Sequence, residues 1–495
     1  MQNIRNFFDK LHLPNWLLIF LSVVIIFRIP SFFEPYSYGD EMIYLALGQG
    51  IRQGIPLYRG IYDNKPPLLY IVAAIAGNLF WFKAILAFIN IISISFFWKL
   101  SEILFPKKNL LHKISTIVFG LLTTLPLLEG NIVNAELFMI APIILSLIIV
   151  FSKKNNFKNL FIAGSLFSIA SLFKIPAFFD LPAVIIFWLI YSISKNTKFR
   201  TFIKKTIYLL VGFATPILLT FIWFYIQGSF KDYIIAAFLQ NVGYLSSWRP
   251  SVTQKPFLIK NLPLLFRGFI VLTTSIFFYL KRKKLSKNFI FITLWLLFAL
   301  FGVTLSERPY PHYLIQAVPA ISLLIAMLFT EKSIEQSLTL IPLTIAFFVP
   351  VFFNYYHYPT LSYYSRFINF ISGRVSKKEY LLSFDKNVIR NYDISNFLAS
   401  SMDKKEKVFI VGDSATIYAL SRKLPPIKFV ADYHINENSS LQNEVDILSQ
   451  NLPKFIVLLP QKTNLTPLIP VIRQNYILVS EIDGVEIWKI SSLNR

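Results

Sequence analysis

The first long hydrophilic stretch of the chain, residues 36–70, brings acids, bases and paired prolines together in an otherwise apolar sequence. Its charged residues are Asp40, Glu41, Arg52, Arg59, Asp63 and Lys65. Charges near lipid are costly, so in membrane proteins they mark sites of chemistry or transport. A carboxylate such as Asp40 can act as a general base toward a hydroxyl or an amine. Lys65 and Arg59 can neutralise a phosphate.

Several of these residues also have structural interpretations. Asp40 precedes an amphipathic helix and could cap its free N–H groups, a role that can coexist with catalysis. Glu41 points in another direction on that helix and is expected to play a supporting part. Lys65 could extend its ammonium group to the membrane interface. Pro66 and Pro67 fit the start of a helix.

Further candidates lie near the ends of other apolar segments. Glu136 lies about one turn inside such a segment, where an acid should face protein or water. It could instead be a carboxylate that is stabilised near a positive helix N-terminus. Glu129 comes at the tip of the preceding turn, and we expect it to be solvated. Lys174 and Asp180 flank the turn into another apolar segment.

The turn at residues 306–313 combines charged and aromatic side chains, namely Arg308, Tyr310 and His312. Arg308 can hold a phosphate beside the membrane. The alternative is that Arg308 extends to the interface and that His312 is an interfacial residue. Trp248 and Arg249 could stack on a sugar ring, although aromatic residues are so frequent in this chain that the pattern is weak.

The composition indicates a membrane protein. The chain has 495 residues, of which 55% are hydrophobic and 15% charged, whereas soluble domains carry about 25% charged residues. The net charge of +23 comes from lysines and arginines in short runs between apolar segments, which favours a membrane over a nucleic acid as partner. Cysteine is absent from the sequence, which excludes disulfides and thiolate metal sites. We expect the N-terminal apolar run to be a retained signal anchor.

About eleven apolar segments are long enough to cross the ~30 Å hydrocarbon layer. They lie near residues 14–31, 84–105, 113–129, 132–151, 159–174, 176–194, 206–227, 262–280, 288–305, 313–330 and 336–355. Placing the segment 67–82 on the outer surface puts most loop lysines and arginines inside. The sequence therefore predicts an all-α polytopic bundle in the cell membrane (plasma or inner), with a cytoplasmic N-terminus and an outer C-terminus.

The composition changes after the last apolar segment. Residues 375–495 alternate polar helical stretches with β-rich runs at 408–412, 428–431, 454–459, 476–482 and 485–490. This alternation predicts a small extracytoplasmic α/β domain with a mostly parallel sheet. Gly412 alone is not a dinucleotide fingerprint, Asp413 or Ser414 is expected to cap a helix, and we expect no catalysis in this domain. The predicted membrane domain is 1–357, with the site residues of its first outer loop at 32–83.

With these features the chain resembles the GT-C membrane glycosyltransferases that use polyprenyl-phosphate sugars. The nearest groups are the protein O-mannosyltransferases, which use dolichyl-phosphate-mannose, and the bacterial aminoarabinose transferases of lipid A. The matching motifs are Gly39-Asp40-Glu41, Lys65-Pro66-Pro67-Leu68, the acid Glu136, and Arg308 with His312-Tyr313. The resemblance covers roughly residues 10–355.

The resemblance implies roles for individual residues. Asp40 would be the catalytic carboxylate, Glu136 a second acid that lines the pocket, and Lys65 and Arg308 phosphate contacts. Taken together with the residue patterns above, the predicted catalytic residues are Asp40, Glu41 and Glu136. The predicted substrate-binding residues are Arg59, Asp63, Lys65, Lys174, Trp248, Arg249, Arg308, Tyr310 and His312. In family members with a metal, an acid precedes the Lys-Pro pair. Here that position is Asn64 and Asp63 comes one step earlier, so no metal ligand is assigned, although a divalent metal stays open.

The leading hypothesis is therefore an enzyme of the cell envelope. It would move one sugar from a polyprenyl-phosphate donor lipid to an acceptor (protein, lipid or glycan) at the extracytoplasmic face, without a nucleic-acid partner. The alternative is a polytopic transporter or flippase of lipid-linked saccharides, which predicts mid-span charges and often an internal repeat. A non-catalytic scaffold is a third hypothesis. It predicts that Asp40→Asn is tolerated.

Overall fold

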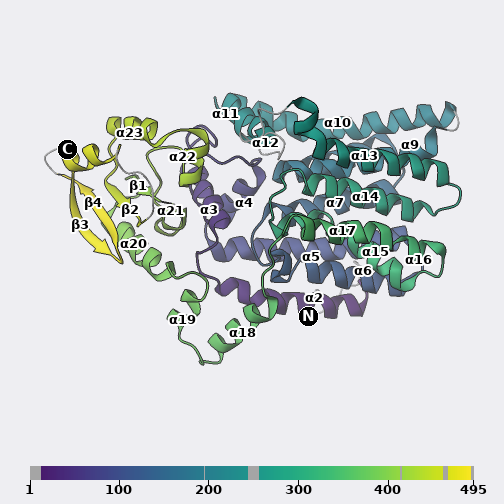
Figure 1. Cartoon of the computed structure of the whole chain (residues 1–495), viewed down its shortest axis with the longest axis horizontal. Coiled ribbons are helices and arrows are strands. Elements are labelled where there is room, and N and C mark those ends of the chain that lie inside the picture. The colour runs from purple at the N-terminus through teal and green to yellow at the C-terminus, as the bar shows by residue number, and fades with distance from the viewer. Residues whose placement is uncertain (1–12, 194–195, 244–255, 413–414, 461–466, 492–495) are drawn as a thin grey trace. The chain divides into compact units, whose positions relative to one another are not determined.

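The computed structural model describes residues 13–193, 196–243, 256–412, 415–460 and 467–491 (Figure 1). The chain forms two compact units. The first, here called the helical unit, consists of Met1–Ile29, Ala84–Ile222 and Asn241–Thr360. The second, here called the mixed unit, consists of Pro30–Lys83, Trp223–Gln240 and Leu361–Arg495.

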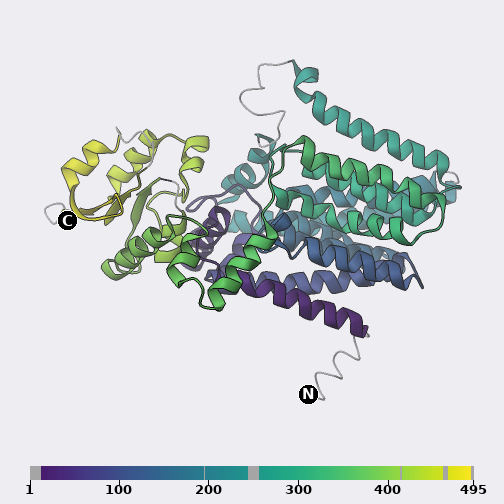
Figure 2. The ribbon, with the colours of Figure 1, turned by 60° about the horizontal axis from the view of Figure 1, so that its bottom comes forward.

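The helical unit is a bundle of apolar helices that run alongside one another (Figures 1 and 2). Their bounds are α2 Asn15–Arg28, α5 Leu79–Leu104, α6 Asn109–Leu122, α7 Ala135–Ser152, α8 Phe157–Phe173, α9 Asp180–Ser192, α10 Asn196–Ile226, α13 Phe257–Lys281, α14 Lys287–Val303, α15 Val318–Thr330, α16 Ile334–Leu338 and α17 Leu340–Phe352. Short 3₁₀ helices, Pro126–Leu128, Ile175–Phe179 and Pro311–Gln316, join some of them. In this unit α7 packs on α8, α6 on α15, and α9 on α14.

Seven helical segments among the described residues are long and apolar enough to span a membrane, which makes the chain a multi-pass membrane protein. They are Asn15–Phe33, Leu79–Leu104, Ala135–Ser152, Ile175–Ser192, Thr197–Ile226, Phe257–Lys281 and Ile334–Phe352. Four shorter apolar helices, α6, α8, α14 and α15, fall on the remaining predicted segments. The count of about eleven spans and the sidedness of the termini stay predictions.

A group of polar contacts links four elements of the bundle. The Trp295 indole N–H of α14 donates to one oxygen of Asp180 (2.5 Å), at the start of α9. The Gln316 amide donates to the other oxygen (2.7 Å) and to the Pro176 carbonyl (2.8 Å). Asp180 thus stabilises the packing of these elements. In this respect its role differs from the one expected for Lys174, which lies at the same turn.

The mixed unit contains short helices and one sheet. Its helices are α3 Gly39–Arg52, α4 Leu68–Ala76, α11 Phe230–Ile234, α18 Thr360–Ile371, α19 Lys377–Leu382, α20 Val388–Ser401, α21 Ala415–Ser421, α22 Asp432–Asn438, α23 Leu441–Gln450 and α24 Ile469–Asn475; α12 Gln240–Gly243 begins at its edge. Helix α3 packs against α4 and α21. A Cβ on Gly48 would lie 2.6 Å from the α4 backbone, so this contact requires glycine.

The predicted surface helix at 67–82 is shorter in the structure. Helix α4 ends at Ala76, and Gly77 follows with a left-handed backbone (φ 69°), a common helix C-terminus. The next helix, α5, already begins at Leu79 and so starts earlier than the predicted segment 84–105. Gly77 is thus the signal that divides the apolar run.

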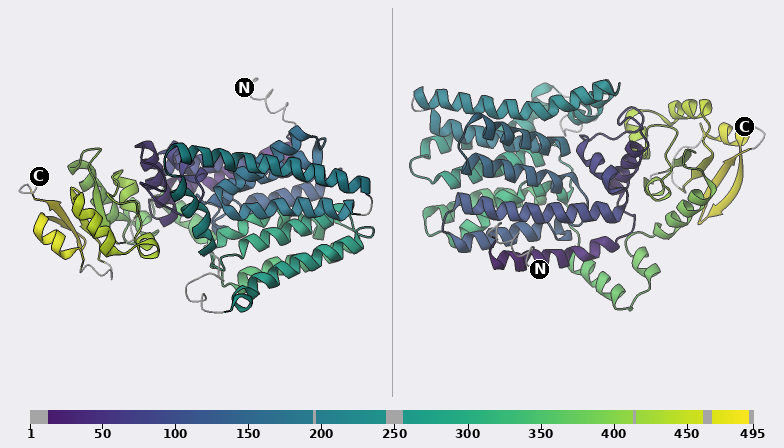
Figure 3. Two further views of the ribbon diagram at one scale, coloured as in Figure 1. Left: turned by 90° about the horizontal axis from the view of Figure 1, so that it is seen from above. Right: turned by 180° about the vertical axis from the view of Figure 1, so that it is seen from behind.

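The prediction of a mostly parallel sheet is wrong. The strand order is β1-β2-β4-β3, with β1 Val408–Val411, β2 Phe455–Leu458, β3 Tyr476–Ile482 and β4 Val485–Ile490. β1 and β2 are parallel, but β4 is antiparallel to both β2 and β3. Asp483 and Gly484 both have positive φ (46° and 74°) and close a tight β3–β4 hairpin, visible in yellow in Figure 3. The expected strand at 428–431 is instead a single bridge from Phe429 to Tyr62.

Candidate active site

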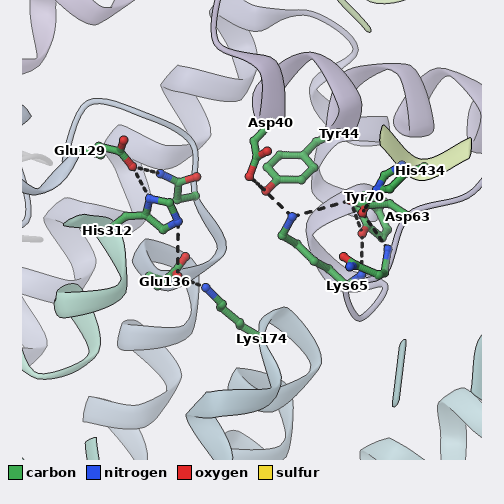
Figure 4. Close-up of polar contacts among 12 residues, drawn as sticks. Asp40, Tyr44, Asp63, Lys65, Tyr70, Glu129, Glu136, Lys174, His312 and His434 are labelled. Carbon is green, nitrogen blue, oxygen red and sulfur yellow. Dashed lines mark hydrogen bonds and ion pairs between the residues drawn. The ribbon is translucent and has the colours of Figure 1, made fainter. Parts of the chain in front are cut away.

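Six polar side chains of the mixed unit meet in one group, here called the loop cluster (Figure 4). Its members are Asp40, Tyr44, Asp63, Lys65, Tyr70 and His434. Asp40 and Tyr44 come from α3, Tyr70 from the first turn of α4, and His434 from α22. Asp63 and Lys65 lie on the loop between α3 and α4.

Asp40 faces Lys65 and is partly accessible. Tyr38 rather than Asp40 is the N-cap of α3, so the capping interpretation of Asp40 is wrong. The Tyr44 hydroxyl, one helical turn further along, donates to Asp40 Oδ2 (2.9 Å). The Lys65 Nζ lies 3.6 Å from the same oxygen, and the Asp40 side chain is 34% exposed. This carboxylate is therefore oriented on one side and open to solvent on the other.

Asp63 is the buried counterpart, with a side chain that is 1% exposed. It accepts hydrogen bonds from the Tyr70 hydroxyl (2.8 Å) and the Asn64 backbone N–H (2.7 Å). Lys65 Nζ lies 3.8 Å and His434 Nε2 3.3 Å from its oxygens. Burial raises the pKa of Asp63, but Lys65, His434 and Tyr70 together hold it below its ordinary value. Asp63 is accordingly a fixed negative charge at neutral pH.

Lys65 lies between the two carboxylates because its backbone is held on both sides. Its carbonyl accepts from the Tyr58 hydroxyl (2.8 Å), and its N–H donates to the Tyr70 oxygen (3.1 Å). Its Nζ lies 5.0 Å from the centre of the Tyr44 ring. The side chain is 23% exposed. The chain thus presents an ammonium group whose charge is compensated from behind and which an anion can still approach.

The loop cluster does not fit a divalent metal. Among the described residues no three His, Asp or Glu side chains are grouped as metal ligands would be. Between Asp40 and Asp63, where a cation could bridge two carboxylates, the structure places the Lys65 ammonium.

His434 is a member of the cluster that the sequence did not indicate. Its side chain is 1% exposed, and its ring packs edge-on against Tyr62 (5.4 Å, 89°). The Tyr62 N–H also donates to the Lys428 carbonyl (2.9 Å), which ties the loop to the C-terminal region. The α/β domain, for which we expected no catalytic part, therefore contributes a side chain that contacts Asp63.

Two other predicted residues of the first loop point elsewhere. Glu41 is buried and pairs with Lys83 (2.8 Å), which also pairs with Glu34 (2.7 Å). This buried triad indicates that Glu41 stabilises the fold around the site. The Arg59 guanidinium is exposed and donates to the Gly228 carbonyl (3.4 Å).

A second group lies in the helical unit and is here called the bundle cluster (Figure 4). Its members are Glu129, Asn134, Glu136, Lys174 and His312. Lys174 pairs with Glu136, and its Nζ lies 3.6 Å from the centre of the Tyr313 ring. His312 Nε2 lies 3.8 Å from Glu136, while its Nδ1 contacts Glu129. Two carboxylates, an imidazole and an ammonium group thus form one buried chain.

The expectation that Glu129 is solvated is wrong. Its side chain is fully buried, where it contacts His312 and accepts from the Asn134 amide (3.2 Å). Glu129 has a left-handed backbone (φ 57°) at the end of a 3₁₀ turn, which turns its side chain inward. Burial and the charge of Glu129 raise the pKa of Tyr358, whose hydroxyl also bonds to this carboxylate.

The structure places the remaining predicted residues as follows. Tyr310 stacks on His312 with ring centres 5.6 Å apart and so borders the bundle cluster. The backbone N–H of Arg308 donates to the Ser306 hydroxyl (3.4 Å). Trp248 and Arg249 lie outside the described residues. That Arg308 and Asp40 face one substrate stays a prediction.

Comparison with known families gives one match, over the C-terminal region. Residues 390–490 match the family model described as "Putative competence-induced protein Ccs4 C-terminal domain". This segment includes His434 and all four strands. No curated protein matches the sequence significantly.

Comparison with solved structures covers nearly the whole chain. The crystal structure of ArnT from Cupriavidus metallidurans bound to undecaprenyl phosphate aligns over 97% of this chain and 98% of that one, with 13% identity and a TM-score of 0.56. The apo state of the same protein aligns over 96% and 97%, with 13% identity and a TM-score of 0.53. The chain therefore shares the fold of ArnT, a GT-C glycosyltransferase, which confirms at the level of the fold the resemblance seen in its motifs.

Proposed function

We propose that this protein is a membrane glycosyltransferase that takes one sugar from a polyprenyl-phosphate donor and transfers it to an acceptor at the extracytoplasmic face. The observation that carries the proposal is the arrangement around Lys65. The buried Asp63 holds the ammonium group, and the partly exposed Asp40 lies on its other side, 3.6 Å away. One carboxylate thus fixes the cation, while the other can reach a substrate.

The arrangement suits a displacement at the anomeric carbon. An acceptor hydroxyl or amine attacks that carbon while Asp40 takes its proton. The bond between the anomeric carbon and the phosphate oxygen breaks, and its electron pair leaves with the polyprenyl phosphate. Lys65 neutralises the charge that develops on this leaving group. Attack opposite the leaving group inverts the anomeric configuration.

The other predicted residues take secondary roles in this proposal. The resemblance implies that Arg308 adds a second cation for the phosphate. In the helical unit, Tyr310 stacks on His312 beside the other members of the bundle cluster. Glu136 pairs with Lys174 in the bundle cluster, and its part in the reaction rests on the resemblance. Asp63 and Glu41 hold other residues in place and do not react. The apolar helices provide a surface for the isoprenoid tail.

The fold supports this proposal over its rivals. ArnT, which has the same fold over nearly the full length, was crystallised with undecaprenyl phosphate. A polyprenyl phosphate presents the one charged group that a compensated ammonium group such as that of Lys65 suits. A flippase of lipid-linked saccharides would also bind such a lipid, but it would not need Asp40 as a base.

Steady-state kinetics with a polyprenyl-phosphate sugar separate the two roles. Lys65→Gln removes a charge-assisted contact to the donor phosphate and should weaken donor binding, with KM for the donor rising about tenfold or more. Asp40→Asn should lower kcat about 10²–10⁴-fold with a smaller change in donor KM. Lys231→Gln, an exposed lysine of the same unit, is the matched control. Equal donor KM values for Lys65→Gln and Lys231→Gln would contradict the assignment of Lys65.

A further inference from the structure

The helical unit contains a cavity of about 440 Å³ at one end of α9, α10 and α14. Three lysines line it, Lys198 and Lys205 from α10 and Lys287 from α14. The part of the wall that α9 forms, here called the aromatic wall, contains Trp188 and Tyr191. Lys205 Nζ lies 5.8 Å from the centre of the Trp188 ring, and Lys287 Nζ lies 5.5 Å from that of Tyr191.

The charges around this cavity are unbalanced. Among the described residues, no Asp or Glu oxygen lies within 4.0 Å of these three ammonium groups, whereas Lys108, elsewhere in the unit, pairs with Glu331 at 2.9 Å. Glu335 acts electrostatically on Tyr191, but its oxygens accept from the Ser286 N–H (2.5 Å) and hydroxyl (2.7 Å). Like charges that surround one cavity repel each other, so an anion there would stabilise the bundle.

Two helix N-termini add to the positive potential. Lys198 lies in the first turn of α10, and Lys287 is the first residue of α14. Neither helix has an acid in its first turn, although acids are favoured there. Helix N-termini bind phosphates through free N–H groups and the helix dipole. At the α14 N-terminus, Ser286 accepts from the Phe289 N–H and Glu335 lies beside Ser286, which offsets part of the positive potential. A cation at a helix N-terminus is unfavourable, so Lys198 in the first turn of α10 favours an added anion.

One buried hydroxyl group at the aromatic wall, that of Tyr191, lacks a hydrogen-bond partner among the described residues. Buried polar groups nearly always have one. A phosphate oxygen in the cavity could accept from it, while Phe187 and Phe202 offer apolar surface for a chain.

We propose that this cavity binds the phosphate headgroup of an anionic membrane lipid, with the start of its acyl chains along the aromatic wall. The cavity lies at the ends of helices that the lysine distribution assigns to the cytoplasmic side. Basic pockets between membrane helices on that side suit such headgroups. The site is independent of the proposed transferase reaction, because it uses none of the residues of the loop cluster or the bundle cluster.

Native mass spectrometry of the full-length protein in detergent tests the proposal with phosphatidylglycerol, phosphatidylcholine and inorganic phosphate as probes. We expect phosphatidylglycerol to bind more tightly than phosphatidylcholine. The triple variant K198Q/K205Q/K287Q should lose affinity for phosphatidylglycerol about fivefold per lysine, on the order of a hundredfold in all. The control K154Q/K158Q/K283Q removes three exposed lysines that do not line the cavity and should leave the affinity within about twofold of wild type.

A charge-preserving variant makes the outcome decisive. K198R/K205R/K287R should retain most of the affinity, which shows that loss in the glutamine variant reflects charge and not a damaged fold. Equal losses in the glutamine variant and the control would overturn the proposal in favour of diffuse surface attraction. Inorganic phosphate that displaces phosphatidylglycerol at equal concentration would overturn the lipid and indicate a free phosphate site.

Discussion

Replacing Asp63 with asparagine should destabilise the protein far more than the same change at Asp40. Asp63 is 1% exposed and Asp40 34% exposed, yet both pair with Lys65. The asparagine at 63 keeps the shape of the side chain but removes its charge. It also turns one acceptor oxygen into a donor that faces either the Tyr70 hydroxyl or the Asn64 N–H.

The size of the stability loss expected for Asp63→Asn follows from the distance between the Asp63 carboxylate and the Lys65 ammonium group. A unit charge pair at the 3.8 Å between Asp63 and Lys65 is worth about 4 kcal/mol at an effective dielectric constant of about 20. Lys65 is 23% exposed and keeps Asp40 as a partner, so we discount this to about 2 kcal/mol. One lost charge-assisted hydrogen bond adds about 1.5 kcal/mol. The expected loss for Asp63→Asn is therefore about 3–4 kcal/mol, against less than about 1 kcal/mol for Asp40→Asn.

Denaturant unfolding of the purified protein in detergent, followed by tryptophan fluorescence, gives the comparison. Asp393→Asn, an exposed carboxylate on α20, is the control for the chemical change alone. A free energy of unfolding for Asp63→Asn within about 0.5 kcal/mol of wild type would refute the role of Asp63 as a buried carboxylate that stabilises the fold. An equal loss in Asp40→Asn would refute the division between a structural and a reactive carboxylate.

Three further predictions follow from the two clusters. The pKa of Asp63 is lower in the folded than in the unfolded chain, so the stabilisation that its charge provides is complete above the unfolded pKa of about 3.9. The difference in unfolding free energy between wild type and Asp63→Asn should therefore stay constant from about pH 7 to 5 and shrink as the pH falls below about 4. His434→Phe keeps the ring against Tyr62 but removes the contact with Asp63, so it should cost about 1–2 kcal/mol of stability and raise the donor KM, unlike the exposed control His357→Phe. Lys174→Met removes the ammonium group that pairs with the buried Glu136 carboxylate and leaves it only the His312 imidazole at 3.8 Å. It should therefore lower the free energy of unfolding by about 3–5 kcal/mol, most of which Glu136→Gln should restore in the double variant. A loss in the double variant equal to the sum of the single losses would contradict this pairing.

The sequence predicted the features that depend on residues close together in the chain. The apolar helices follow from runs of apolar residues, and Asp40 and Lys65 meet because the loop that follows α3 returns Lys65 to the first turn of that helix. Tyr44 could have been found from its i,i+4 spacing to Asp40. The β3–β4 hairpin also had its signal in Asp483-Gly484, which the alternation of strands and helices obscured.

Other features depend on contacts that no local pattern encodes. His434 reaches Asp63 from a helix 371 residues later in the chain, through packing of Tyr62 against the C-terminal region. Glu129 looked like a solvated turn residue, and His312, far along the chain, makes it part of a buried group. The burial of a charged loop residue depends on the partner that the fold places beside it, and the residues next to it in the sequence do not identify that partner.

We propose that Asp40 catalyses sugar transfer from a polyprenyl-phosphate donor. The most direct measurement follows label from polyprenyl-phosphate sugars, labelled in the sugar, in membranes that contain wild type, Asp40→Asn or Asp393→Asn at matched amounts of folded protein. We expect label to leave one donor of the panel in wild type and in Asp393→Asn, and to leave it at least a hundredfold more slowly in Asp40→Asn. Transfer by Asp40→Asn at the wild-type rate, or no transfer from any donor by folded wild type, would contradict it.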